Sequence, residues 1–400
     1  MKYVQELQLV FAAPLPIINS RFYCIFVSFS YHGNMSPKIT RISLTGGPCA
    51  GKSTALVHIS ERFKNLGYQV FCVPEAATLL ITGGMGLVGS TIGDTISVQT
   101  RLISLQMALE DSFYTAALAS EKPAIIIADR GTMDSSAFLE PHVWQAILDE
   151  NGWTTVGLRD KRYDAVIHMV TAAKGAESCY TLANNAARTE TPEQARQVDD
   201  KLIAAWTGHP HLRIIDNSTD FEAKIRRVLD ALARIVGIPE PVEIERKYLV
   251  AEVGEIPVPH ETVEIEQVYL QTSDGNRARI RKRGQRGAYT YFHTLKRSVS
   301  AGQRIEEERQ ITPREYASYL TSADPNRVPI HKTRTCFMWN SQYYELDRFI
   351  SPCPGLILLE AELDTLHQSV TIPPWIKIVR DVTDEPQYTN ATLAKKGGKS

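Results

Sequence analysis

The chain has 400 residues, with 44 Lys and Arg against 45 Asp and Glu and a formal net charge of −1 at pH 7. This length exceeds what one hydrophobic core usually organises, so we expect two domains. The near-zero charge argues against bulk electrostatic attraction to nucleic acid or to a membrane, and leaves only a local, peripheral membrane contact open. The six cysteines form no CxxC pair, which is typical of reduced, small apolar side chains in a cytoplasmic protein.

The first 37 residues contain two apolar runs, at 9–18 and 22–30, which Arg21 and two prolines interrupt. Neither run approaches the length of a membrane-spanning helix, so we expect no transmembrane segment. We interpret residues 1–37 as a dispensable or disordered N-terminal extension. Translation from Met35 is one explanation for it, and a targeting segment is the alternative.

A Walker A motif occupies residues 46–53, between a β-prone apolar run at 39–45 and a helix-compatible run at 54–63. Glycines let backbone N–H groups turn toward a phosphate, and the helix that starts there adds its positive N-terminal dipole. The pattern predicts ATP or GTP binding with Mg²⁺ or Mn²⁺, rather than a chance glycine-rich turn. The expected nucleotide-binding residues are Gly46, Gly47, Pro48, Cys49, Ala50, Gly51, Lys52, Ser53 and Thr54, with Lys52 on the β and γ phosphates and Ser53 on the metal.

Apolar β-type runs alternate with helical patterns from residue 38 to residue 237, which predicts an α/β P-loop domain with a parallel sheet and helices on both faces. A final amphipathic helix is expected at 221–235. The expected strands are 39–45, 69–73, 124–128, 164–170 and 212–215.

Two carboxylates follow expected strands at the edge that holds the phosphate loop. Asp129 comes directly after 124–128 and is a candidate catalytic residue, because it could hold Mg²⁺ through water or accept a proton from an attacking hydroxyl. Its alternative role is that of a helix N-cap or turn residue. Glu75 follows the second strand, and a solvated loop residue explains it equally well.

A polar segment at 178–200 lies between the last two expected strands. In small phosphotransfer kinases such a segment forms a lid whose arginines cover the transferring phosphate, so Arg188 and Arg196 join Lys52 as candidate catalytic residues. A surface-helix pair with Glu193 explains Arg196 almost as well. After the last strand, Asn217 is a candidate base-binding residue.

Together these motifs resemble the NadR-like kinase group of P-loop proteins over residues 38–237. The resemblance implies a nucleoside- or nucleotide-kinase scaffold and leaves the phosphate acceptor open. The residues that carry it are Gly-Gly-Pro-Cys-Ala-Gly-Lys-Ser-Thr, Val-Pro-Glu-Ala-Ala, Asp-Arg-Gly, Asn-Asn-Ala-Ala-Arg-x-Glu and Gly-His-Pro-His-Leu-x-Ile-Ile-Asp-Asn-Ser.

After a Pro-containing linker at 238–241, charged residues alternate along several β-type runs between 242 and 400. Solvent exposure explains any one of these strands, but repetition over six or more favours an antiparallel β-barrel with a polar lumen. Basic side chains there would clamp a polyphosphate, and carboxylates would hold divalent cations. The alternating residues are Glu243, Glu245 and Lys247; Arg277, Arg279, Arg281 and Arg283; Arg304, Glu306 and Glu308; Lys332 and Arg334; Glu345 and Asp347; Glu360 and Glu362.

This half, from about 242 to 395, resembles the CYTH superfamily, the triphosphate tunnel metalloenzymes, through Glu-x-Glu-x-Lys at 243–247 and the pairs that follow it. The resemblance implies metal-dependent hydrolysis or cyclisation of triphosphates. The implied metal ligands are Glu243, Glu245, Asp347, Glu360 and Glu362, and the implied triphosphate ligands are Lys247, Arg277, Arg279, Lys296, Arg304, Lys332 and Arg334.

The order of the two halves resembles the group typified by the insect TRPL-translocation-defect protein. That resemblance implies a non-catalytic GTP- and phosphoinositide-binding regulator of membrane-protein trafficking. Two functions therefore stand: an enzyme with phosphotransfer at the P-loop and triphosphate hydrolysis in the tunnel, and a binding protein that uses the same pockets as sensors. Intact catalytic-type residues in both halves favour the enzyme.

Overall fold

The computed structural model describes residues 38–180, 191–238, 245–272, 277–300, 303–340, 342–363 and 368–396, and for 296–300 and 303–307 it describes the backbone only. The N-terminal extension, Arg188, residues 239–241 of the linker and Glu243 lie outside these residues. None of the described helices combines the length and apolar character that a bilayer crossing needs.

The first sheet is parallel, with the strand order β2-β3-β1-β4-β5. The five strands expected from the sequence are confirmed, with ends that differ by at most one residue. Their bounds are β1 Ile39–Gly46, β2 Gln69–Val73, β3 Ala124–Asp129, β4 Ala165–Met169 and β5 Leu212–Ile215. Burial explains why β3 is apolar as far as Asp129 and why β4 is apolar apart from His168.

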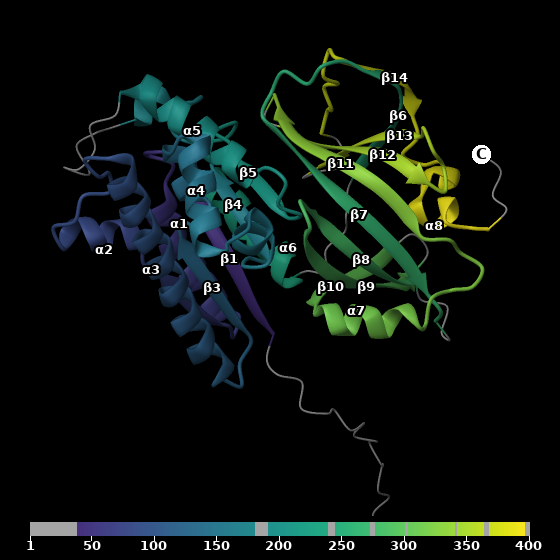
Figure 1. The fold of residues 1–400 in the computed structure, drawn as a ribbon, viewed down its shortest axis with the longest axis horizontal. Coiled ribbons are helices and arrows are strands. Elements are labelled where there is room, and N and C mark those ends of the chain that lie inside the picture. The colour runs from purple at the N-terminus through teal and green to yellow at the C-terminus, as the bar shows by residue number, and fades with distance from the viewer. Residues whose placement is uncertain are drawn as a thin grey trace, which may run out of the picture. The chain divides into compact units, whose positions relative to one another are not determined.

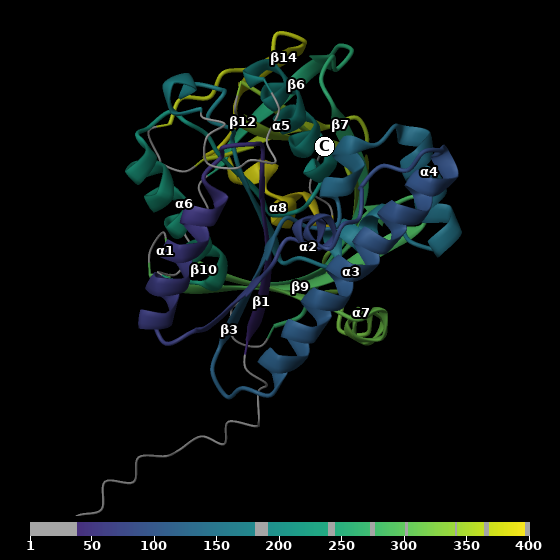
Figure 2. The same ribbon diagram turned by 90° about the vertical axis from the view of Figure 1, so that its left-hand side faces the viewer.

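Helices cover both faces of this sheet. On one face, α1 and α6 pack through Phe63 and Leu232, and on the other α3, α4 and α5 pack through Ile103, Ile147 and Trp206. Figure 2 shows α1 and α6 on one side of β1 and β3, with α3 and α4 on the other. The bounds are α1 Lys52–Asn65, α2 Ala76–Thr82, α3 Ile92–Leu118, α4 Pro141–Asn151, α5 Pro192–Trp206 and α6 Phe221–Val236.

The second sheet is antiparallel and has nine strands in the order β10-β9-β8-β7-β11-β12-β13-β6-β14. Figure 1 shows it strongly curved, with β8, β9 and β10 at one end of the curve and β6, β13 and β14 at the other. Within the described residues the edge strands β10 and β14 do not pair with each other, so the expected closed barrel is not confirmed. The bounds are β6 Glu245–Val253, β7 His260–Leu270, β8 Arg277–Gln285, β9 Ala288–Ser300, β10 Gln303–Ile311, β11 Ile330–Trp339, β12 Gln342–Ser351, β13 Ile357–Glu362 and β14 Ile376–Asp381.

One face of this sheet is apolar where α7 (Pro313–Leu320) covers it. Tyr316 of α7 packs against Val268, Ala278 and Ile280. Because successive side chains of a strand point to opposite faces, the arginines that alternate with Ala278 and Ile280 lie on the other face. A short helix, α8 (Asn390–Leu393), packs near the end of the described chain through Leu393.

Candidate functional site

The phosphate loop connects β1 to α1, and its glycines are required by geometry. Gly46 has φ 154° and Gly51 has φ 94°. A Cβ on Gly46 would lie 2.2 Å from the carbonyl oxygen of Met169, and one on Gly51 would lie 2.6 Å from the Phe221 ring. The first turn of α1 contains no acidic residue and Gly51 provides no side-chain cap, so the positive end of the helix faces the loop without a competing carboxylate.

Lys52 lies at the start of α1 with its Nζ 4.0 Å from Oδ1 of Asp129. Burial and the nearby positive charge of Arg130 lower the pKa of Lys52 to about 8, although Asp129 acts in the opposite direction. The protonated form of such a buried lysine is stabilised most when a phosphate supplies the compensating negative charge.

Asp129 ends β3, and its Oδ1 is buried without a hydrogen-bond partner among the described residues. No side chain caps the 3-10 helix η1 (Asp134–Phe138) that follows, so the alternative role of Asp129 as an N-cap is wrong. Burial, and then the neighbouring charge of Glu75, raise the pKa of Asp129, and Lys52 opposes them. A buried carboxylate oxygen that accepts no hydrogen bond, beside a phosphate loop, fits Mg²⁺ or a metal-bound water.

Arg130, which the sequence analysis did not single out, connects the carboxylates around the loop. It has φ 68°, unusual for a residue other than glycine, and its side chain bonds to Glu75 at 2.6 Å and to Asp134 at 3.2 Å. Asp134 also accepts hydrogen bonds from Thr45 and from the Trp206 indole. Glu75 is therefore not a solvated loop residue. It holds Arg130 beside Lys52. Burial works against the charged form of Glu75, but Arg130, the Thr78 hydrogen bond and Lys52 together outweigh it and lower the pKa of Glu75.

The lid and base candidates have mainly structural partners in the described residues. Arg196 bonds to Glu193 at 2.6 Å, as the surface-helix alternative expected, and to the backbone oxygen of Ala173 at 3.0 Å. The Asn217 amide donates to the backbone oxygens of Thr171 and Lys174, both at 2.7 Å. Its Oδ1 accepts from a buried lysine of α6, Lys224, at 2.7 Å. Asn217 therefore joins the segment that follows β5 to the segment that follows β4.

In the second half, strand register brings the alternating charges together on the face opposite α7. Arg334 of β11 lies opposite Asp347 of β12, Glu345 lies opposite Glu360 of β13, and Glu360 lies opposite Lys247 of β6. The resulting cluster, which we call the charged face, consists of Lys247, Lys332, Arg334, Glu345, Asp347 and Glu360.

Each carboxylate of the charged face is bonded to a basic side chain. Arg334 donates to Asp347 and to Glu360, both at 2.7 Å, and contacts Glu345. Lys247 lies 3.0 Å from Glu360, and Lys332 pairs with Asp347. Burial works against the charged form of Glu360, but Lys247 and Arg334 outweigh it and hold its pKa well below the usual range.

The other predicted ligands of the second half are more scattered. Arg277 is exposed, Arg279 is half-buried, and Glu245 pairs with Lys247 at 3.1 Å. Glu362 accepts from Arg213 at 2.7 Å instead of joining Glu360. The side chains of Lys296 and Arg304 are not described. In the part of the chain that the structure describes, no group of three or more His, Cys, Asp or Glu side chains is placed to hold a metal ion.

The sequence analysis placed Arg281 and Glu308 among the alternating charges without giving either a role. The Arg281 guanidinium donates to Glu308 of β10 at 2.7 Å, and Thr294 donates to the other oxygen of the same carboxylate. Alternation identified the shared face of these residues. Only strand register shows which of them meet.

Comparison with known proteins gives one family model and relatives that are named inorganic triphosphatases. A family model described as an AAA domain matches residues 41–224. An inorganic triphosphatase of Acetivibrio thermocellus is 28% identical over 153 residues, which is 38% of this chain and 93% of that protein.

Among solved structures, an inorganic triphosphatase is 31% identical, with a TM-score of 0.29, over 38% of this chain and 95% of that one. A protein from Pyrococcus horikoshii is 20% identical, with a TM-score of 0.24, over 31% of this chain and 79% of its own. The chain thus contains an AAA-type P-loop domain at residues 41–224, and a stretch of 153 residues is similar to an inorganic triphosphatase.

Proposed function

We propose that this cytoplasmic protein binds ATP or GTP at its phosphate loop and, in its second half, binds and hydrolyses a triphosphate with the help of a divalent metal. The charged face carries the proposal. Three basic and three acidic side chains are gathered on one face of the second sheet, and Lys332, Arg334, Asp347 and Glu360 are all at least nine-tenths buried. Bringing so many charges out of water costs several kcal/mol for each ion, which a polyanion bound together with cations offsets.

At the phosphate loop, Lys52 would bind the β and γ phosphates and the Ser53 hydroxyl would hold Mg²⁺. Asp129 supports a phosphotransferase-type role, since its Oδ1 accepts no hydrogen bond among the described residues and is available to the metal, to a metal-bound water or to an attacking hydroxyl. Arg188 and Arg196 remain candidates for covering the transferring phosphate.

On the charged face, a triphosphate would compete with the carboxylates for Lys247, Lys332 and Arg334. As those cations turn to phosphate oxygens, Glu345, Asp347 and Glu360 lose their partners and become oxygen donors for Mg²⁺ or Mn²⁺. A metal bound there would supply Lewis-acid activation of the terminal phosphorus and of the attacking water. The triphosphate and the metal should therefore strengthen each other's binding.

The expected tunnel extends this proposal to the other end of the second sheet. The remaining phosphates of the triphosphate would be contacted by Arg277, Arg279, Lys296 and Arg304. Glu243, Glu245 and Glu362 would be further metal ligands. The proposed domains are 38–237 and 242–400, joined by the linker at 238–241.

The alternative is a non-catalytic regulator that binds GTP and a phosphoinositide head group, in which the same cations would hold the inositol phosphates. It rests on the similarity in domain order alone, and no described contact favours it over catalysis.

Phosphate release from purified full-length protein separates the two functions. Inorganic triphosphate, ATP and GTP would each be offered with Mg²⁺, with Mn²⁺ and with excess chelator. We expect metal-dependent release from inorganic triphosphate. If the folded protein binds triphosphate or phosphoinositide vesicles but releases no phosphate with either metal, catalysis is excluded and the regulatory function is favoured.

A further inference from the structure

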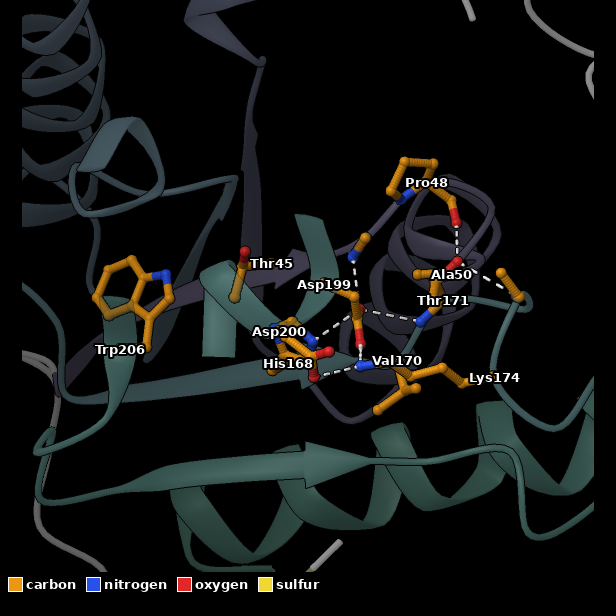
Figure 3. Close-up of polar contacts among 12 residues, drawn as sticks. Thr45, Pro48, Ala50, His168, Val170, Thr171, Lys174, Asp199, Asp200 and Trp206 are labelled. Atoms are coloured by element: carbon orange, nitrogen blue, oxygen red, sulfur yellow. Dashed lines mark hydrogen bonds and ion pairs between the residues drawn. The ribbon is translucent and has the colours of Figure 1, made fainter. Parts of the chain in front are cut away.

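A single carboxylate behind the phosphate loop joins three segments of the first domain. The Asp199 side chain is fully buried in α5, and its Oδ1 accepts from the backbone N–H groups of Gly47 and Thr171, both at 3.0 Å. His168 Nε2 lies 3.1 Å from the same oxygen, and Lys174 Nζ donates to Oδ2 at 3.0 Å. Figure 3 shows Asp199 among His168, Thr171 and Lys174, with its contacts as dashed lines.

This carboxylate stays ionised at any working pH. Burial alone would favour its neutral form, but His168 and Lys174 outweigh burial and lower the pKa of Asp199 to about 2. A charged acceptor shared by several donors forms hydrogen bonds roughly twice as strong as neutral ones.

The Asp199 contact explains a glycine that the Walker A pattern does not require. That pattern needs the glycines at 46 and 51, whereas the residue at 47 is variable. A Cβ on Gly47 would lie 2.7 Å from Asp199 Oδ1 and 3.0 Å from the Thr171 Cβ. The backbone approaches the carboxylate so closely that no side chain fits at this position.

Two further contacts hold the same side of the loop. Thr171 Oγ1 donates to the backbone oxygen of Pro48 at 2.5 Å, and Lys224 donates to the backbone oxygen of Ala50 at 3.1 Å. Of these three contacts with the loop backbone, that of Asp199 is the one that brings a negative charge, through the N–H of Gly47.

We propose that Asp199 is the positioning residue of the phosphate loop: its charge fixes the Gly47 N–H from behind and so sets the direction of the loop N–H groups that receive the nucleotide phosphates. Asp199 does not touch the nucleotide. The proposal rests on the proposed nucleotide binding at this loop.

The test compares Asp199→Asn with Asp200→Asn in the full-length protein. Asp200 is a matched control, because it is the next residue of α5, lies 2.6 Å from the same Lys174, and has a 69% exposed side chain. Three quantities would be measured: the melting temperature, the Kd for ATP and GTP with Mg²⁺ per mole of folded protein, and hydrogen exchange of a peptide containing Gly47 without nucleotide.

We expect Asp199→Asn to weaken nucleotide binding by about tenfold or more and to accelerate exchange at Gly47, as loss of about 1.4 kcal/mol or more would produce. Asp200→Asn should leave both unchanged. A folded Asp199→Asn protein with the wild-type Kd would overturn the proposal, whatever its melting temperature, since a merely structural role changes stability and not the affinity of folded molecules.

If Asp199→Asn does not fold, Gly47→Ala decides, because its methyl group displaces the loop from the same contact. Wild-type affinity in Gly47→Ala would then overturn the proposal. If the wild-type protein itself binds neither ATP nor GTP, the proposed function fails. Unchanged hydrogen exchange at position 47 in either variant would separately refute the role of Asp199.

Discussion

Burial gives Lys52 a pKa of about 8, because desolvation and the positive charge of Arg130 outweigh the attraction of Asp129. The lysine is therefore protonated below about pH 8 and loses its charge above it. Because phosphates bind the protonated form, we expect the Kd for ATP or GTP to rise by up to about tenfold per pH unit above pH 8. Nucleotide titrations from about pH 7 to about pH 9.5 measure this. Lys52→Arg stays charged over this range and is the control, and a Kd that does not change with pH in the wild type would contradict the prediction.

The role proposed for Asp129 differs from that of Lys52, since Asp129 would hold the metal or a metal-bound water and Lys52 would contact the phosphates. We expect Asp129→Asn to bind Mg²⁺–ATP or Mg²⁺–GTP within about threefold of the wild type and to lose nucleotide turnover by about a hundredfold or more. Paired measurements of Kd and kcat distinguish the two effects. Asp149→Asn, at an exposed position of α4, is the control. Unchanged turnover in Asp129→Asn would remove Asp129 from the reaction.

At the scale of elements, the first sheet could be predicted closely from the sequence because each strand is a short stretch rich in β-branched and other apolar residues. The charged face of the second sheet could be predicted as well, because alternation alone places Lys332 and Arg334 on one side of a strand. Which strands pair could not be predicted from the sequence, since β7 and β11 are neighbours although four elements separate them in the chain. Asp199 looked like one of several charges on a surface helix, and only the fold brings it to Gly47.

Strand pairing changes the expectation for the two glutamates of β13. Glu360 is bonded to Lys247 and Arg334, so Glu360→Gln leaves these cations undercompensated and should lower the free energy of unfolding by about 1.5–3 kcal/mol at neutral pH. Glu362 has a 44% exposed side chain and pairs with Arg213, so Glu362→Gln should cost less than about 1 kcal/mol. Urea denaturation of both variants measures the difference, and equal losses would refute the role of Glu360 in the charged face.

The same contact predicts the effect of acid. Because the folded-state pKa of Glu360 is depressed, its contribution to stability is fully present above the ordinary glutamate pKa of about 4.3 and is lost as the pH falls below that value. Glu360→Gln should therefore lose less stability than the wild type between about pH 5 and about pH 3. Urea denaturation at several pH values measures the free energy of unfolding of both proteins. Equal losses of this free energy in the two proteins over this range would contradict the prediction.

At the scale of the whole molecule, the two candidate sites are built from different sheets, and their key residues can be changed one at a time. We expect Lys52→Ala to abolish nucleotide binding at the phosphate loop while retaining inorganic triphosphate hydrolysis within about twofold, because no described contact joins Lys52 to the charged face.

Glu360→Gln should lose triphosphate hydrolysis by about a hundredfold or more and keep the wild-type Kd for ATP or GTP, because no described contact joins Glu360 to the phosphate loop. Excess chelator should stop hydrolysis in the wild type without unfolding it. The measurement is phosphate release and nucleotide binding on the same preparations. Loss of both activities in either folded variant would show that the two sites work as one, and retention of triphosphate hydrolysis in Glu360→Gln would exclude the charged face as the hydrolytic site.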